Sequence, residues 1–435
     1  MPGDSGSFNG LLDVALEGGW RIQLKPPMGR YRLAQIGLAV STTLLCLVAI
    51  DRIVVATFPL GNIIYRFHPE QLYEYTPGAS KFFIHLAENG GDWIRVEINS
   101  TGQRGEEIDS SNAATRIVVY GDSFVAAEFS PLEESYVFRV GEILTASTTD
   151  RVESINAGLV GAGPDQMARR IEADLPRLRP DAIVLAVNAA NDFGDLVRNR
   201  LYRVSASGRL VAESPGLGPL TRRALEPELL SHSGWGRLLR AARQGLALRL
   251  QQWRSGPEGS TQAGRPVAGV LIRSRWIENR NRFVRRDPVV RNLFNDSYDA
   301  DLSLRPNSRF AKDKKALMAA VLGEIHRIVS EAGVPLLIVV IPSPIDVTED
   351  HYGLLIDWRR FPDYDGDALS RGVVEPALAL GLAVVDLTDS MRSSEAPSSL
   401  FFRAGNDHWN ARGQELGARM TAERILELGW IEDPD

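Results

Sequence analysis

The sequence is short of cysteine and histidine, and each shortage excludes a kind of site. Cys46 is the only cysteine in 435 residues, so neither an intrachain disulfide nor a cysteine-based metal cluster can form. Most of the histidines show no spacing typical of metal ligation: His68, His85, His232, His326 and His351. No cofactor is expected. The chain also lacks an excess of positive charge, since its formal net charge is −6, and this argues against general nucleic-acid binding.

Long hydrophobic runs are equally scarce, and the most extended one lies near the N-terminus. Residues 33–50 carry no charge, and as a helix they would span roughly 27 Å, close to the thickness of a bilayer core. Basic residues gather before this run, namely Arg21, Lys25, Arg30 and Arg32. The positive-inside rule therefore predicts a cytoplasmic segment at 1–32, an inner-membrane anchor at 33–55 and an exported, periplasmic remainder. A cleaved signal peptide and a buried core helix are the alternatives.

The remainder of the chain alternates between apolar runs and amphipathic stretches, which is typical of βαβ units around a parallel sheet. Strands are predicted at 116–120, 152–159, 182–188, 335–342 and 382–387, and helices at 135–147, 165–178, 312–333 and 413–429. The sequence thus predicts an α/β fold: a three-layer α/β/α arrangement on a parallel, flavodoxin-like five-stranded sheet.

Two stretches do not follow this alternation. Residues 56–115 mix aromatic, glycine and polar residues and predict only a short strand within 93–107, so they are assigned to an extracytoplasmic lead-in segment. Residues 196–305 interrupt the pattern and are assigned to one large insertion. The hydrolase-like domain is therefore expected in two parts, 116–195 and 306–435.

Polar residues come directly after the predicted strands, where a doubly wound sheet collects its functional groups. They form four short sequences: GDS at 121–123, NAGLVG at 156–161, NAAND at 188–192 and GNDHWN at 405–410. Together these sequences supply a hydroxyl, a glycine N–H, an amide side chain and an imidazole. Acyl transfer by a serine nucleophile needs these groups, because a base must activate the hydroxyl and donors must stabilise the oxyanion.

In this order, GDSF, the glycine of NAGLVG, the AxND of 189–192 and the late DHWN resemble the sequence blocks of the SGNH (GDSL) hydrolase superfamily. The resemblance covers roughly residues 93–430 without the insertion. It implies that Ser123 is the nucleophile and His408 its general base. It also implies an oxyanion hole made by the N–H groups of Ser123 and Gly161 and the side chain of Asn191.

The sequence departs from the family pattern beside His408. The superfamily usually has an aspartate three residues before the histidine, and some membrane-associated acetylation enzymes have it two before, but Gly405 and Asn406 occupy these positions. Asp407 is adjacent to His408 and is the favoured orienting residue, although neighbouring side chains in an extended segment point apart. Asn406 is the alternative, as in Cys-His-Asn sites. A simple Ser-His pair is the third arrangement.

The remaining polar residues of these blocks have simpler expected roles. Asp122 is expected to accept hydrogen bonds in its turn, and Trp409 and Asn410 to shape the loop that holds His408.

The resemblance implies a membrane-anchored serine esterase that acts on O-acyl groups, O-acetyl foremost, of envelope or exported polysaccharide, by hydrolysis or acyl transfer. Its expected partners are an acylated glycan substrate, the membrane through one helix, and an envelope biosynthesis complex, with no nucleic acid. A lipid esterase or thioesterase is the alternative among enzymes. A catalytically silent glycan-binding or scaffold protein is the alternative from another class, because the usual aspartate is missing.

Overall fold

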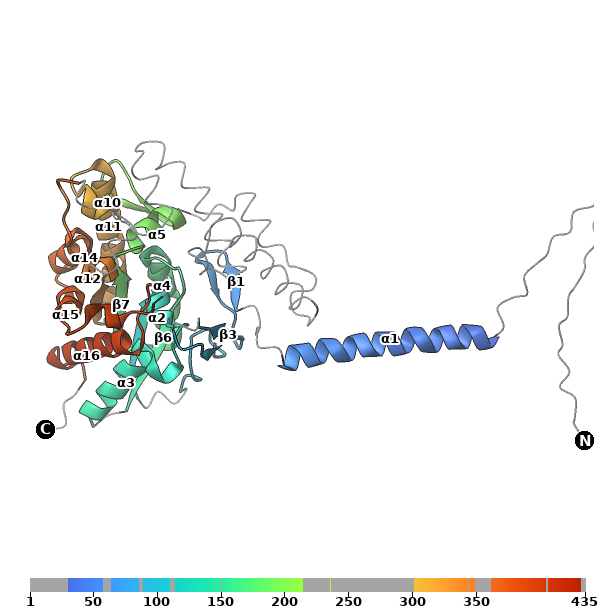
Figure 1. The fold of residues 1–435 in the computed structure, drawn as a ribbon. Coiled ribbons are helices and arrows are strands. Elements are labelled where there is room, and N and C mark those ends of the chain that lie inside the picture. The colour runs from blue at the N-terminus through green and yellow to red at the C-terminus, as the bar shows by residue number, and fades with distance from the viewer. Residues whose placement is uncertain are drawn as a thin grey trace, which may run out of the picture.

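The protein is described by a computed structural model in which a sheet is covered by helices on both faces (Figure 1). The description covers residues 30–57, 64–85, 89–109, 114–149, 151–213, 235, 301–342, 344–348, 361–403 and 406–431.

The sheet consists of the five predicted strands, all parallel. They are β5 (Thr115–Gly121), β6 (Val152–Gly158), β7 (Ala182–Asn188), β10 (Leu336–Ile341) and β11 (Ala383–Asp386). Their order is β11-β10-β7-β5-β6. When the five strands are numbered 1 to 5 along the chain and read from β6, this is the flavodoxin-like order 2-1-3-4-5. Every residue of β7 and β10 is buried, as expected for apolar strands covered on both faces. The predicted fold class is confirmed.

Alternate residues of the strands face two separate layers of helices. One layer holds α4 (Pro164–Leu178), α11 (Arg309–Glu331) and α14 (Ala368–Ala379), whose apolar residues pack with Val118, Ile183 and Ile338. The other layer holds α3 (Tyr136–Ser147) and α16 (Ala411–Glu427), which pack with Ile117, Val184 and Leu337. Because all five strands are parallel, their carboxyl ends lie at the same edge of the sheet.

The lead-in segment is more ordered than the sequence predicts. It forms two antiparallel hairpins, β1 (Tyr65–His68) with β2 (Leu72–Tyr75), and β3 (Ser80–Ile84) with β4 (Trp93–Glu97). Apolar and aromatic residues of both hairpins belong to the same buried cluster as the sheet, including Tyr73, Ile94 and Val96. The hairpins are therefore part of the folded domain.

The predicted insertion is only partly described. After β7 come α5 (Asp192–Asn199) and a small hairpin of β8 (Tyr202–Val204) and β9 (Leu210–Ala212). The chain is described again at α10 (Asp301–Leu304). Residues 214–234 and 236–300 lie outside the described part, and so does most of the predicted insertion.

Helix α1 (Arg30–Thr57) contains the hydrophobic run and extends away from the sheet in Figure 1. Its stretch Arg32–Val54 has a mean hydropathy of 2.1, and none of its most apolar window is buried. By length and composition this helix is a candidate membrane span or signal sequence.

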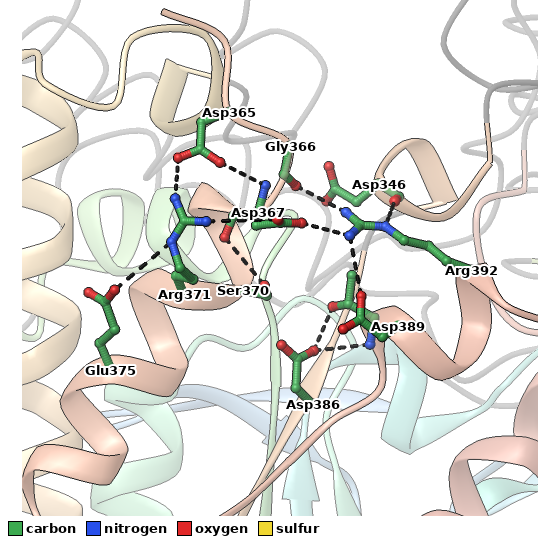
Figure 2. Close-up of polar contacts among 11 residues, drawn as sticks. Asp346, Asp365, Gly366, Asp367, Ser370, Arg371, Glu375, Asp386, Asp389 and Arg392 are labelled. Atoms are coloured by element: carbon green, nitrogen blue, oxygen red, sulfur yellow. Dashed lines mark hydrogen bonds and ion pairs between the residues drawn. The ribbon is translucent and has the colours of Figure 1, made fainter.

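Hydrogen bonds and ion pairs connect the segments that follow β10 and β11 (Figure 2). Arg392, at the end of α15 (Thr388–Arg392), donates to the Asp346 carbonyl of α12 (Pro344–Val347) at 2.6 Å and to Asp367 at 2.6 Å. Arg371 of α14 pairs with Asp365 on the same side. These contacts are half-exposed, so each adds little stability, but together they connect α12, α14 and α15.

Candidate active site

Asp122 organises the turn that presents Ser123. The strand β5 ends at Gly121, and the short helix α2 (Ser123–Ala126) begins directly after Asp122. The buried Asp122 carboxylate accepts the Phe124 N–H at 2.9 Å, and its other oxygen accepts the side-chain amides of Asn188 at 3.0 Å and Asn191 at 3.3 Å. Asp122 is thus the hydrogen-bond acceptor predicted for this turn, and it also connects the loops after β5 and β7.

The loop after β6 lies directly against the same turn. Gly158 pairs with Gly121 in the sheet, and the Leu159 N–H donates to the Gly121 carbonyl at 2.9 Å. A Cβ at Gly158 would lie 2.2 Å from the Ala126 nitrogen, so only glycine allows α2 to pack this close. Three of the four predicted strand ends therefore meet around Ser123.

His408 comes from the segment before α16 and contacts Ser123. Its Nε2 atom lies 2.7 Å from the Ser123 Oγ. The ring stacks on Phe124, with centroids 4.8 Å apart, and packs against Phe129 at 4.3 Å. A nucleophile and base within hydrogen-bond distance are the geometry that serine catalysis requires.

Asn406 contacts the far side of the His408 ring. The Asn406 Oδ1 atom lies 2.9 Å from Nδ1 and also accepts the backbone N–H of His408 at 3.2 Å. A backbone N–H can only donate, so the atom that faces it must be the amide oxygen rather than the nitrogen. That oxygen can only accept, so Nδ1 carries the ring proton and Nε2 of the neutral ring is free to accept from Ser123.

The contact at Nδ1 favours Asn406, the alternative orienting residue, over Asp407. Asp407 is exposed, whereas Asn406 and His408 are half-buried. The alternative interpretation, with an amide at the ring, describes the contacts.

The rest of the DHWN block supports this loop. Trp409 is fully buried, and Asn410 caps α16 by accepting the N–H groups of Arg412 and Gly413. The Asn410 amide also donates to the carbonyls of Ser399 at 2.8 Å and Phe401 at 3.0 Å. Both residues shape the His408 loop, as predicted.

The two other residues assigned to the oxyanion hole lie on the neighbouring loops. Gly161 has a φ of 71°, and its carbonyl accepts from Arg198 at 2.5 Å. Asn191 precedes α5, and its amide nitrogen uses one N–H on Asp122, which leaves the second N–H. Ser123 is the first residue of α2, where a backbone N–H has no partner within the helix.

Buried acids lie behind this site. Burial raises the pKa of Asp192 well above its usual value, and the nearby Asp122 and Asp195 carboxylates raise it further. Burial also raises the pKa of Asp165 to about 6, although Asn199 and the Leu201 N–H partly offset this effect. Within the described ranges, no group of three or more His, Cys, Asp and Glu side chains could hold a metal ion.

Residues missed by the sequence analysis also touch the site. His85 contacts the Phe129 carbonyl through Nε2 at 2.6 Å, and its ring lies 4.7 Å from Phe402. Asn89 accepts the Arg403 N–H at 2.8 Å and donates to the Arg403 carbonyl at 3.0 Å. These contacts come from the lead-in hairpins, and no motif in the sequence indicates them.

Comparison with known proteins agrees with the fold. Residues 297–434 match the family model described as ALGX, an SGNH hydrolase-like domain, acetyltransferase AlgX. No match was found among curated proteins.

Similar solved structures are distant. The lipase/acylhydrolase from Enterococcus faecalis shares 13% identity at a TM-score of 0.34, covering 74% of this chain and 98% of that one. A putative lipolytic protein of the G-D-S-L family from Desulfitobacterium hafniense DCB-2 shares 10% identity at a TM-score of 0.31, covering 71% of this chain and 99% of that one. A catalytic mutant of Axe2, an acetylxylan esterase from Geobacillus stearothermophilus, shares 14% identity at a TM-score of 0.35, covering 74% of this chain and 98% of that one. These values carry no conclusion about activity.

The family match covers the second half of the domain, and the GDS turn with its bonded histidine lies on the parallel sheet built by both halves. Residues 297–434 are therefore similar to an SGNH hydrolase-like domain.

Proposed function

We propose that this protein is a serine esterase or acyltransferase that acts on O-acyl groups, O-acetyl foremost, of an envelope or exported polysaccharide. The observation that carries the proposal is the connected chain of Asn406, His408 and Ser123, at 2.9 and 2.7 Å. The match to a domain described as an acetyltransferase supports the acyl group and the transfer chemistry. The candidate membrane helix supports a place at the envelope.

In the first half-reaction, the Ser123 oxygen attacks the ester carbonyl while its proton moves to Nε2 of His408. The Nδ1–H stays hydrogen-bonded to the Asn406 oxygen, so the ring keeps the orientation that presents Nε2 to the serine. The carbonyl oxygen gains negative charge, which the N–H groups of Ser123 and Gly161 and the free N–H of Asn191 stabilise. Removing one such preorganised donor costs about 3–4 kcal/mol of transition-state stabilisation.

Collapse of this intermediate breaks the bond to the sugar oxygen, which takes the proton back from Nε2 and leaves Ser123 acylated. A second nucleophile then gives its proton to Nε2 and attacks the acyl carbonyl, and the bond to the Ser123 oxygen breaks as that oxygen takes the proton back from Nε2. Water as this nucleophile completes hydrolysis, and a sugar hydroxyl completes acyl transfer. Asn406 adds no charge opposite the transient imidazolium, so its part is to hold the ring and its tautomer.

The test compares the full-length protein in detergent with its Ser123→Ala variant, using p-nitrophenyl acetate and an O-acetylated xylan oligosaccharide. Loss of a nucleophilic serine costs on the order of 10⁶-fold in kcat, so the variant should show no turnover. A fluorophosphonate should label the wild-type protein at Ser123, read by mass spectrometry.

The matched control is Ser207→Ala, which changes an exposed serine in the β8–β9 turn and should keep full activity. Equal turnover by wild type and the Ser123 variant would contradict the proposal. Mass analysis of the sugar products separates acetate release from acetyl transfer.

A further inference from the structure

Gly161 lies in a tight turn between β6 and α4. The Ala162 N–H donates to the Leu159 carbonyl at 3.0 Å, so residues 159–162 form a β-turn. Gly161 has a positive φ of 71°, and Val160 is not among the residues with positive φ. A positive φ at the third position alone identifies a type II turn.

Types I and II differ by rotation of their central peptide, which here joins Val160 to Gly161. The dihedral angles on either side of that peptide change by about 150–170° between the two types. Glycine tolerates both forms, because it has no Cβ to disfavour either sign of φ. The residue type alone therefore does not determine where the Gly161 N–H points.

A hydroxyl from the lead-in segment contacts this peptide. Tyr73, on β2, donates its O–H to the Val160 carbonyl at 2.9 Å, and the side chain is almost fully buried. In a trans peptide the carbonyl and the following N–H point in opposite directions. Fixing the Val160 carbonyl against Tyr73 therefore directs the Gly161 N–H to the other side of the turn.

The backbone hydrogen bonds agree with this arrangement. Among the described residues, none of the backbone hydrogen bonds starts at the Gly161 amide. The next carbonyl, that of Gly161 itself, is held by the buried Arg198. The β1–β2 turn is held in place by the Gln166 side chain of α4, which donates to the Gln71 carbonyl at 2.7 Å.

We propose that Tyr73 is a positioning residue that keeps the Val160–Gly161 peptide in the type II orientation, with its N–H available to the oxyanion. This inference rests on the proposed function. Without the Tyr73 hydroxyl, the type I form would become populated. In that form the Val160 carbonyl would replace the Gly161 N–H, and a lone pair would face the developing negative charge.

The experiment uses full-length Tyr73→Phe in detergent, with p-nitrophenyl acetate as substrate and phenylboronic acid as probe. The boronic acid forms a tetrahedral adduct with a serine oxygen and so reports on the oxyanion hole rather than on ground-state binding. We expect kcat to fall about tenfold, within the roughly 10²–10³-fold cost of losing a donor outright. The Ki for phenylboronic acid should rise by the same factor, while KM changes less than twofold.

Tyr75→Phe is the matched control. Tyr75 lies on the same strand and is equally buried, but its hydroxyl donates to Glu128 at 2.8 Å and not to the turn. It should lose stability to a similar extent, read as the thermal unfolding midpoint, and keep kcat and Ki near the wild-type values. Equal losses of kcat and Ki in both variants would show a general effect of the hairpin and overturn the inference.

A second variant tests the turn itself. Gly161→Ala disfavours the positive φ, so it should raise the boronic acid Ki as Tyr73→Phe does, and the double variant should lose little more than either single one. If the boronic acid Ki of Tyr73→Phe or of Gly161→Ala equals that of the wild type, the inference is overturned and the proposed function still stands. A wild-type protein without turnover or Ser123 labelling would overturn the proposed function and the inference with it.

Discussion

At the residue scale, His408 is held by an amide where the superfamily usually has a carboxylate. Asn406 is a competent partner only while its oxygen faces the ring, and the backbone N–H of His408 keeps it so. An amide in the opposite orientation would impose the wrong tautomer, which costs about 10⁴-fold in serine proteases. The site therefore obtains the correct tautomer through backbone geometry and not through charge.

Removing this amide should impair the base. We expect Asn406→Ala to lower kcat on the order of 10²-fold, because the ring loses the acceptor that fixes its Nδ1 proton. Asp407→Asn is the control and should change kcat less than threefold, since Asp407 is exposed. Steady-state kinetics with p-nitrophenyl acetate measures both, and the reverse ranking would restore Asp407 as the orienting residue.

Adding the missing charge should shift the pH dependence. In Asn406→Asp, a carboxylate would lie next to the ring and favour the imidazolium form. The acid limb of the kcat/KM profile should then move to higher pH by about one unit. A profile that superimposes on that of the wild type would show that residue 406 does not contact the ring in solution.

Asp165 gives the folded state a pH dependence of its own. Burial raises its pKa to about 6, so between about pH 4 and 6 the folded chain keeps a proton that the unfolded chain has lost. The stabilising contribution is therefore present at acid pH and is lost as the pH rises through about 6. A shift of about two units corresponds to about 3 kcal/mol.

The matching measurement is urea unfolding at pH 4 and pH 7. Asp165→Asn cannot ionise at this position. We therefore expect the free energy of unfolding to fall between pH 4 and pH 7 by about 3 kcal/mol more in the wild type than in Asp165→Asn. Asp389→Asn, on an exposed side chain, should keep the wild-type difference. Parallel curves for wild type and Asp165→Asn would mean that Asp165 titrates normally.

At the element scale, the five core strands could be predicted because each is an apolar run followed by turn residues. The observed β7 has the predicted bounds, Ala182–Asn188, and β5, β6, β10 and β11 differ from prediction by a residue or two. Ser123 and His408 were predictable from their blocks. The contact between them, across 285 positions of sequence, required the structure.

The lead-in hairpins could not be predicted in the same way. Their strands are four or five residues long, and they are stabilised by distant partners rather than by their own pattern. Tyr65 and Tyr75 donate to the buried Glu128, and Lys81 pairs with the same carboxylate. Asn406 was ranked below Asp407 because sequence shows which residues are neighbours but not which way their side chains point.

The β3–β4 hairpin should influence the position of His408 through Asn89. Asn89 makes two hydrogen bonds to the Arg403 backbone, and the adjacent Phe402 N–H donates to the His408 carbonyl at 2.9 Å. Each such bond contributes about 1 kcal/mol, so Asn89→Ala should lower kcat about tenfold with little change in KM. Arg95→Ala, on the exposed side of β4, is the control and should keep wild-type kcat. Wild-type kcat in Asn89→Ala would mean that the His408 loop holds itself.

At the scale of the whole molecule, the charge asymmetry around α1 predicts an exported catalytic domain. A reporter that is active only outside the cytoplasm, fused to the C-terminus, should give signal, and the protein should fractionate with membranes. Replacing Leu44 and Leu45 by arginine should abolish both results, because charge at the centre of a span opposes insertion. A soluble product in the wild type, with the N-terminus removed, would show a signal sequence instead of an anchor.

The lead-in hairpins also bear on how short a folded version of this protein can be. A chain that starts at residue 115 would keep the whole sheet together with Ser123 and His408. It would nevertheless leave Glu128 as a buried acid without its two tyrosines and its lysine, and the Val160 carbonyl without its donor. We therefore expect such a truncation to lower the activity proposed above, although it keeps the GDS turn and His408. We expect the shortest fully active version to begin near residue 64, before the first hairpin.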